Sequence, residues 1–135
     1  MRTIPLKPVP VQYAHNKGNH AEQAFEFAVT GKISPANNRP HTAGGDVLQY
    51  QVKSPKASVC RGTNLDAYLD EDGAREYAFV NKDVTTAYIM SRAEWTDFVK
   101  AFGYKTRESS KNGGGEKIRL LDESKRMVQY LQERV

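Results

Sequence analysis

The sequence has few residues of the types that form disulfides or bind zinc. Its 135 residues include one cysteine, Cys60, and three histidines scattered at positions 15, 20 and 41. A lone cysteine cannot form an internal disulfide, which is typical of a protein kept in a reducing cytosol, and the histidines show no zinc-ligand spacing. Because Cys60 follows Val59 in an apolar alternation, we expect a buried structural thiol rather than a nucleophile.

Long hydrophobic runs and nucleotide-binding motifs are missing as well. No apolar stretch approaches the roughly 18 residues that span a bilayer. The first residues, MRTIPLKPVPVQY, are broken by prolines where a secretory signal carries its hydrophobic core. The glycines of NGGGEK lack the preceding apolar strand and the lysine–serine ending of a P-loop, and there is no GxGxxG fingerprint. We therefore expect a cytoplasmic protein with no membrane partner.

Length and composition are those of one polar globular domain. A chain of 135 residues can build one hydrophobic core, and 39% hydrophobic and 27% charged residues are ordinary values for such a domain. We predict a single domain over residues 1–135. Residues 1–15 are expected to form an extended arm, because prolines recur in the first ten positions.

The positive charge is modest and unevenly spread, with a net value of +4 at pH 7. Lys53, Lys56 and Arg61 follow one another with no acid between them. A second basic group near the end of the chain consists of Lys105, Arg107, Lys111, Lys117 and Arg119. The acidic stretch LDAYLDEDGARE separates the two groups. This distribution predicts a polyanion-binding surface on one side of the fold, with ordinary solvated charge as the alternative.

The hydrophobic pattern predicts a mixed α/β domain. Helices are expected over residues 19–30, 64–72, 91–103 and 122–135. Strands are expected over residues 46–53, 56–62, 76–81, 84–91 and 116–121, and a turn at 82–83 joins the third and fourth strands in a hairpin near the sheet centre. Residues 104–115 are expected to form a flexible basic loop.

Capping residues support the helix boundaries. The residues expected at helix ends are Asn19, Gly31, Asn64, the Ser91–Glu94 capping box, Gly103 and Asp122. The third helix has the clearest apolar face, which consists of Trp95, Phe98, Val99 and Phe102.

Polar side chains that could hydrolyse a phosphodiester gather on the strand DVLQYQVK. Period two places Gln51 and Lys53 on one face, and Asp46 lies at the strand entrance beside two glycines that let the backbone bend. A carboxylate and neighbouring oxygen ligands can hold a divalent metal, and a lysine can contact the phosphate or orient the attacking water. The alternative is a strand whose polar residues simply face solvent.

The same residues resemble a known family. An acid, a short gap, then acid-or-glutamine, any residue and lysine is the core motif of the PD-(D/E)XK, or restriction-endonuclease-like, nucleases. Here GD at 45–46 and QVK at 51–53 give the form D-x4-Q-x-K. The glutamine is similar to that of the Mrr-type branch, and the short gap resembles that of the mismatch-repair nicking endonuclease. The resemblance implies a mixed sheet of about four to five strands flanked by helices.

The family often adds a glutamate from the helix before the sheet, and Glu22 occupies that place here. Glu22 is also the third residue of a capping box opened by Asn19, so a purely structural role stays open. Glu26 is expected at the surface, or in place of Glu22 if the helix starts later. Two positions depart from the family: Gly45 replaces the usual proline, and the neutral Gln51 replaces the second acid.

The resemblance implies a metal-dependent DNA endonuclease. Asp46 would be the main ligand for Mg²⁺, with Mn²⁺ able to substitute, Gln51 a weaker ligand and Glu22 an auxiliary ligand or base. Lys53 would orient the attacking water and bind phosphate. The residues expected to contact DNA phosphates are Ser54, Lys56, Arg61, Arg107 and Lys111.

One site per chain would nick one strand, and cutting a duplex would need a homodimer or two visits. The first alternative is a non-catalytic nucleic-acid-binding protein on the same scaffold, and the second is a basic protein–protein adaptor.

Overall fold

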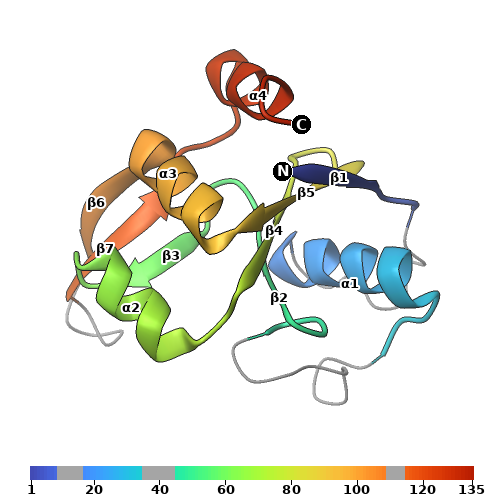
Figure 1. The fold of residues 1–135 in the computed structure, drawn as a ribbon, viewed down its shortest axis with the longest axis horizontal. Helices are drawn as coiled ribbons and strands as arrows, with labels where there is room; N and C mark the ends of the chain where they lie inside the picture. The colour runs from blue at the N-terminus through green and yellow to red at the C-terminus, as the bar shows by residue number, and fades with distance from the viewer. Residues whose placement is uncertain (9–16, 35–44, 109–114) are drawn as a thin grey trace.

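The computed structural model describes residues 1–8, 17–34, 45–108 and 115–135 (Figure 1). For residues 17–19 only the backbone is described. In these ranges the chain forms four helices and two sheets, one of four strands and one of three. The predicted mixed α/β class is confirmed. None of the helices in the described part of the chain is both long and apolar enough to cross a bilayer.

The larger sheet has the strand order β1-β5-β4-β2. β4 (Glu76–Val80) and β5 (Thr86–Ser91) form the predicted central hairpin, with Tyr77 opposite Met90. β2 (Tyr50–Lys53) lies parallel to β4, so the intervening chain crosses over through β3 and α2. β1 (Arg2–Pro5) pairs antiparallel with β5, and the arm expected over residues 1–15 is therefore part of the sheet at its start.

The smaller sheet was not expected as a separate unit. Its order is β3-β7-β6, formed by β3 (Ser58–Arg61), β7 (Gly115–Leu120) and β6 (Gly103–Glu108). The prediction of a loop from residue 104 is wrong for residues 104–108, because this polar segment pairs with β7 along its length, from Gly103 opposite Leu120 to Glu108 opposite Gly115. The rest of the predicted loop lies in residues 109–114, outside the described residues.

Each of the helices α2, α3 and α4 begins after a residue whose side chain caps it. Two of these caps were predicted, and the cap of α4 differs from the prediction. α2 (Leu65–Asp72) begins after Asn64, whose side chain accepts a hydrogen bond from the backbone N–H of Ala67. α3 (Arg92–Phe102) has the predicted capping box of Ser91 and Glu94. α4 (Lys125–Gln132) is capped by Ser124 and not by Asp122, because the Ser124 hydroxyl accepts from the backbone N–H of Met127.

The first helix is longer than expected. α1 (Lys17–Thr30) begins two residues before Asn19, which therefore lies inside the helix instead of capping it. Its end agrees with the prediction, because Gly31 adopts a left-handed φ of 74°. At the end of α3, by contrast, Gly103 has an extended φ of −91° and starts β6 directly.

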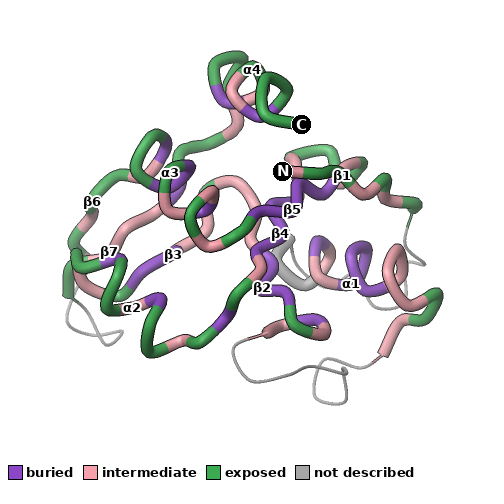
Figure 2. The backbone as a smooth tube through the Cα atoms, in the orientation of Figure 1, coloured by how far each residue is buried: buried purple, intermediate pink, exposed green. Residues whose placement is uncertain are grey.

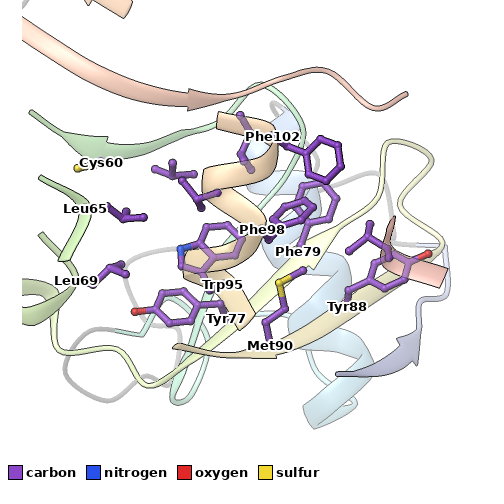
Figure 3. Close-up of a cluster of buried hydrophobic side chains, with 14 of the residues drawn as sticks. Cys60, Leu65, Leu69, Tyr77, Phe79, Tyr88, Met90, Trp95, Phe98 and Phe102 are labelled. Carbon is purple, nitrogen blue, oxygen red and sulfur yellow. The ribbon is translucent and has the colours of Figure 1, made fainter. Parts of the chain in front are cut away.

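Two apolar clusters cover the two faces of the larger sheet (Figure 2). The larger cluster joins α3 to β4 and β5, and its aromatic centre is drawn in Figure 3. There Tyr77 and Trp95 stack with ring centroids 5.2 Å apart, and Phe79 packs against Phe98 at 4.9 Å. The smaller cluster lies between α1 and the sheet, where Phe25 meets Tyr50 edge-on at 5.1 Å. The sheet is thereby covered on both faces, and β2 is its edge strand.

Candidate catalytic site on strand β2

A tight turn brings Asp46 back beside the strand that follows it. The backbone N–H of Asp46 donates to the Tyr50 carbonyl at 2.8 Å, and the Asp46 Oδ2 atom accepts from the backbone N–H of Val52 at 2.9 Å. Gly45 is required here, since an added Cβ would lie 2.1 Å from the Leu48 carbonyl oxygen. A turn over residues 47–49 thus holds the Asp46 carboxylate next to β2, and the strand predicted over residues 46–53 is a strand only from Tyr50.

Gln51 and Lys53 contact other parts of the chain instead of facing solvent along an open strand. The Gln51 residue is only 8% exposed, and its Nε2 atom donates to Asp72 Oδ1 at 3.3 Å. Lys53 Nζ donates to the Ser58 carbonyl at 3.1 Å, which ties β2 to the beginning of β3. Tyr50 and Val52 belong to the cluster under α1. For Gln51 the solvent-facing alternative is therefore wrong.

Asp72, the last residue of α2, is the site residue that sequence reasoning missed. Burial raises the pKa of its carboxyl, the positive charge of Lys53 opposes that rise, and the negative charge of Asp46 adds to it. These influences place Asp46, Lys53 and Asp72 in one electrostatic neighbourhood. The available signal was a run of acids, residues 70–72, in the last turn of a helix, where the helix dipole disfavours negative charge.

An open groove of about 660 Å³ lies beside Asp72. It is lined by Arg61, Gly62, Thr63, Asn64, Ala67, Tyr68, Glu71 and Asp72. Burial and the negative charge of Asp72 raise the pKa of Tyr68, while the positive charge of Arg61 lowers it. Among the residues that line the groove, Arg61 is the one cation, and both it and Asp72 act on the Tyr68 hydroxyl.

The other residues predicted to contact DNA are spread over different surfaces. Ser54 and the exposed Lys56 line a second groove of about 340 Å³, together with His20 and Lys82. Arg107 is exposed on β6 and lies opposite Glu116 of β7 in the strand register. Lys111 lies outside the described residues. The charge pattern predicted one continuous basic surface on one side of the fold, and that surface stays a prediction.

Part of the second basic group is neutralised within the smaller sheet. Glu108 Oε2 lies 2.8 Å from Lys117 Nζ, and Glu108 Oε1 lies 2.7 Å from Arg119 Nη2. The two cations hold the pKa of Glu108 below its usual value. The Arg119 Nη1 atom also donates to the Lys56 carbonyl at 3.0 Å. Lys117 and Arg119 therefore contribute less free positive charge than their count suggests.

The two glutamates of α1 differ in their surroundings. Glu26 was expected at the surface, but only 1% of it is exposed, and its Oε1 atom accepts from the backbone N–H of Ser34 at 3.1 Å. Glu22 is half-buried on the same helix. Among the described residues no three His, Cys, Asp or Glu side chains form a group that could hold a metal. Glu22 does not complete such a group with Asp46 and Asp72, and its assignment as a ligand stays a prediction.

The donors near Asp46 are nevertheless of the kind that Mg²⁺ accepts. Mg²⁺ is commonly bound through one or two carboxylates, with water and substrate phosphate completing its octahedral shell. Asp46 is such a carboxylate, Gln51 adds an amide oxygen, and the negative charge of Asp72 lies within electrostatic reach of Asp46. The set fits a hard divalent cation and lacks the sulfur or imidazole that would favour zinc.

Cys60 has the structural role that the sequence predicts. The side chain is buried in the larger apolar cluster (Figure 3), and burial raises the pKa of its thiol. A raised pKa reduces the fraction of reactive thiolate at neutral pH, so the residue is unsuited to nucleophilic catalysis.

No family model, curated protein or solved structure matches this chain. The family resemblance therefore depends on the motif of residues 45–53 and on the surroundings that the fold gives it.

Proposed function

We propose that this protein is a metal-dependent endonuclease that hydrolyses phosphodiester bonds in DNA. The observation that carries the proposal is the convergence on β2 of Asp46, fixed by the Val52 N–H, with Gln51 and Lys53. These are the acid, the amide and the amine that the motif of the restriction-endonuclease-like nucleases implies. Each of these three side chains makes a hydrogen bond to another part of the chain, which the polar residues of a simply solvated strand face would not need to do.

In this proposal Asp46 and Gln51 hold Mg²⁺ or Mn²⁺, with Glu22 as an auxiliary ligand or base. When bound, the metal would neutralise phosphate charge and lower the pKa of a coordinated water. Lys53 uses one N–H on the Ser58 carbonyl. Because an ammonium group has three donors, two remain for the phosphate and the attacking water. Its tether to β3 limits the positions that the ammonium group can take and so orients it.

Replacing Lys53 by alanine tests this function. We expect wild-type protein with Mg²⁺ or Mn²⁺ to nick supercoiled plasmid, EDTA to stop the reaction, and Lys53→Ala to lower the rate about 10²–10³-fold, the usual cost of losing one charge-stabilising donor. The matched control is Lys125→Ala on α4, an exposed lysine at the start of a helix, which should nick at the wild-type rate.

Two results would contradict the nuclease. If Lys53→Ala nicked DNA at the wild-type rate, Lys53 and the motif to which it belongs would have no part in the reaction. If no variant nicks DNA but the wild type retains it in a salt-sensitive way, the protein is a binding module on a related scaffold. The replacement of the second acid by Gln51 is the observation that favours this alternative.

The proposed partner is DNA, and Arg61 is a predicted phosphate contact that lines the same groove as Asp72. We expect Arg61→Ala to weaken duplex binding at low salt. The slope of log affinity against log salt concentration should fall by about one, because one fewer counterion is released. Titrations of one labelled duplex at several salt concentrations measure this, with Arg75→Ala, exposed just before β4, as the matched arginine. An unchanged slope for Arg61→Ala would place DNA elsewhere, and a wild type without salt dependence would favour a protein–protein adaptor.

The cellular context follows from the same assignment. We propose a cytoplasmic enzyme, consistent with one buried thiol and no disulfide. One site per chain makes nicking of a single strand the basic reaction, and cleavage of both strands would require a homodimer or two binding events.

A further inference from the structure

The contact between Gln51 and Asp72 determines how the Gln51 side chain is oriented. A glutamine side chain ends in a donor nitrogen and an acceptor oxygen, and a carboxylate can accept only from the nitrogen. Asp72 Oδ1 takes that hydrogen bond at 3.3 Å, and Gln51 is 8% exposed, so water competes weakly for the amide. The amide oxygen is thereby turned away from Asp72 and is available on the strand.

Asp72 also carries a negative charge at a place that is costly for it. It is the last residue of α2, where the helix dipole opposes an anion. Its Oδ2 atom is buried and makes no hydrogen bond of ordinary geometry with the described residues, although the backbone N–H of Ala74 is close enough to lower the pKa of the carboxyl. A buried polar atom in such surroundings calls for an explanation, and a role at a functional site is one. The charges that act on it come from Lys53 and Asp46, the two charged residues of the motif.

We propose that Asp72 is a positioning residue of this site, which fixes the Gln51 amide and supplies, one hydrogen bond away, the negative charge that position 51 lacks. The inference rests on the proposed nuclease function and extends it to a residue 21 positions from Gln51 in the sequence. In the family motif one acidic residue at this position supplies both the metal-binding oxygen and the negative charge. Here Gln51 would supply the oxygen, and Asp72 would supply the charge.

An exchange of the two groups tests the pair. In Gln51→Glu/Asp72→Asn the carboxylate and the amide trade places, so one donor, one acceptor and one negative charge remain. We expect Asp72→Asn alone to lower kcat about 10–100-fold, as loss of an orienting partner does, with little change in KM for DNA. The exchanged pair should recover to within about threefold of wild type, because the interaction is restored. Asp66→Asn, an exposed acid on the same helix that lies outside the groove of Arg61 and Asp72, is the matched control and should stay near wild type.

Two further measurements do not depend on cleavage. Mn²⁺ binding to the free protein, followed by electron paramagnetic resonance, should weaken about 10–100-fold in Asp72→Asn and recover in the exchanged pair. The side-chain amide signals of Gln51 in ¹H–¹⁵N spectra should shift in Asp72→Asn and stay in place in Asp66→Asn.

The outcomes separate the two proposals. If wild type fails to nick DNA while Mn²⁺ binding and the amide signals follow the expected pattern, the nuclease assignment falls and the positioning role stands. If Asp72→Asn matches Asp66→Asn in all three measurements, or if the exchanged pair is no more active than Asp72→Asn alone, the positioning role is overturned.

Discussion

Asp46→Asn is expected to reduce the rate of DNA nicking by about a thousandfold or more. If Asp46 is the main carboxylate ligand, as proposed, its loss removes the Lewis-acid contribution of several kcal/mol, and about 4 kcal/mol corresponds to three orders of magnitude in rate. The fold should tolerate the change, because the asparagine side-chain oxygen can still accept from the Val52 N–H, the contact that Asp46 Oδ2 makes at 2.9 Å. DNA retention should therefore change much less than cleavage.

Single-turnover nicking and filter retention of the same duplex, at one salt concentration, separate the two effects. Asp97→Asn, an exposed acid on α3, is the matched substitution and should leave both quantities unchanged. If Asp46→Asn nicks as fast as wild type, Asp46 is not the metal ligand. If it loses DNA retention while its circular dichroism stays native, the residue belongs to the binding surface instead of the reaction.

Local sequence signals were enough for the elements that local interactions define. The Ser91–Glu94 capping box and the apolar stripe of α3 predicted that helix, and β-branched and aromatic residues on both sides of a two-residue turn predicted the β4–β5 hairpin. Asn64 correctly indicated the start of α2. In each case the information lies within a few residues, as it does in caps and tight turns.

Elements that depend on distant partners were missed. β6 is polar and mostly exposed, so its alternation carries no hydrophobic signal, and it is a strand because β7 satisfies its backbone. The beginning of β1 was taken for an unpaired arm for the same reason, since its partner β5 lies more than eighty residues away. The cap of α4 was placed two residues early because Asp122 and Ser124 are both good N-cap residues.

The candidate site was predicted in part for the same reason. Period two and the double glycine indicated Asp46, Gln51 and Lys53 because these residues lie within eight positions of one another, on β2 and the turn before it. Asp72 joins them only through the crossover that places α2 near β2, and no spacing rule reports that contact. The burial of Glu26 likewise depends on the chain after α1, which reaches back to its carboxylate through Ser34.

The second large effect concerns the core and not the chemistry. Phe98→Ala is expected to lower the free energy of unfolding by about 3–5 kcal/mol, the usual cost of removing a buried phenylalanine side chain. Phe98 is 0% exposed, and its ring contacts Phe79, Trp95 and Phe102 (Figure 3), as well as Tyr130, at centroid distances of 4.9 to 6.0 Å. These partners come from β4, α3 and α4, so one cavity weakens the packing between three elements.

Urea unfolding followed by circular dichroism measures this loss as a lower midpoint with an unchanged slope. Leu121→Ala is the matched control, because that side chain is 42% exposed and should cost about 0.5 kcal/mol or less. Domains of this kind have about 5–15 kcal/mol in total, so Phe98→Ala removes a large fraction of the stability. At a temperature where the variant is still folded, its Mn²⁺ affinity should match wild type, because the ring partners of Phe98 belong to β4, α3 and α4 and not to β2 or the turn that carries Asp46. A loss of Mn²⁺ binding in the folded variant would instead mean that the aromatic cluster and the β2 site are coupled.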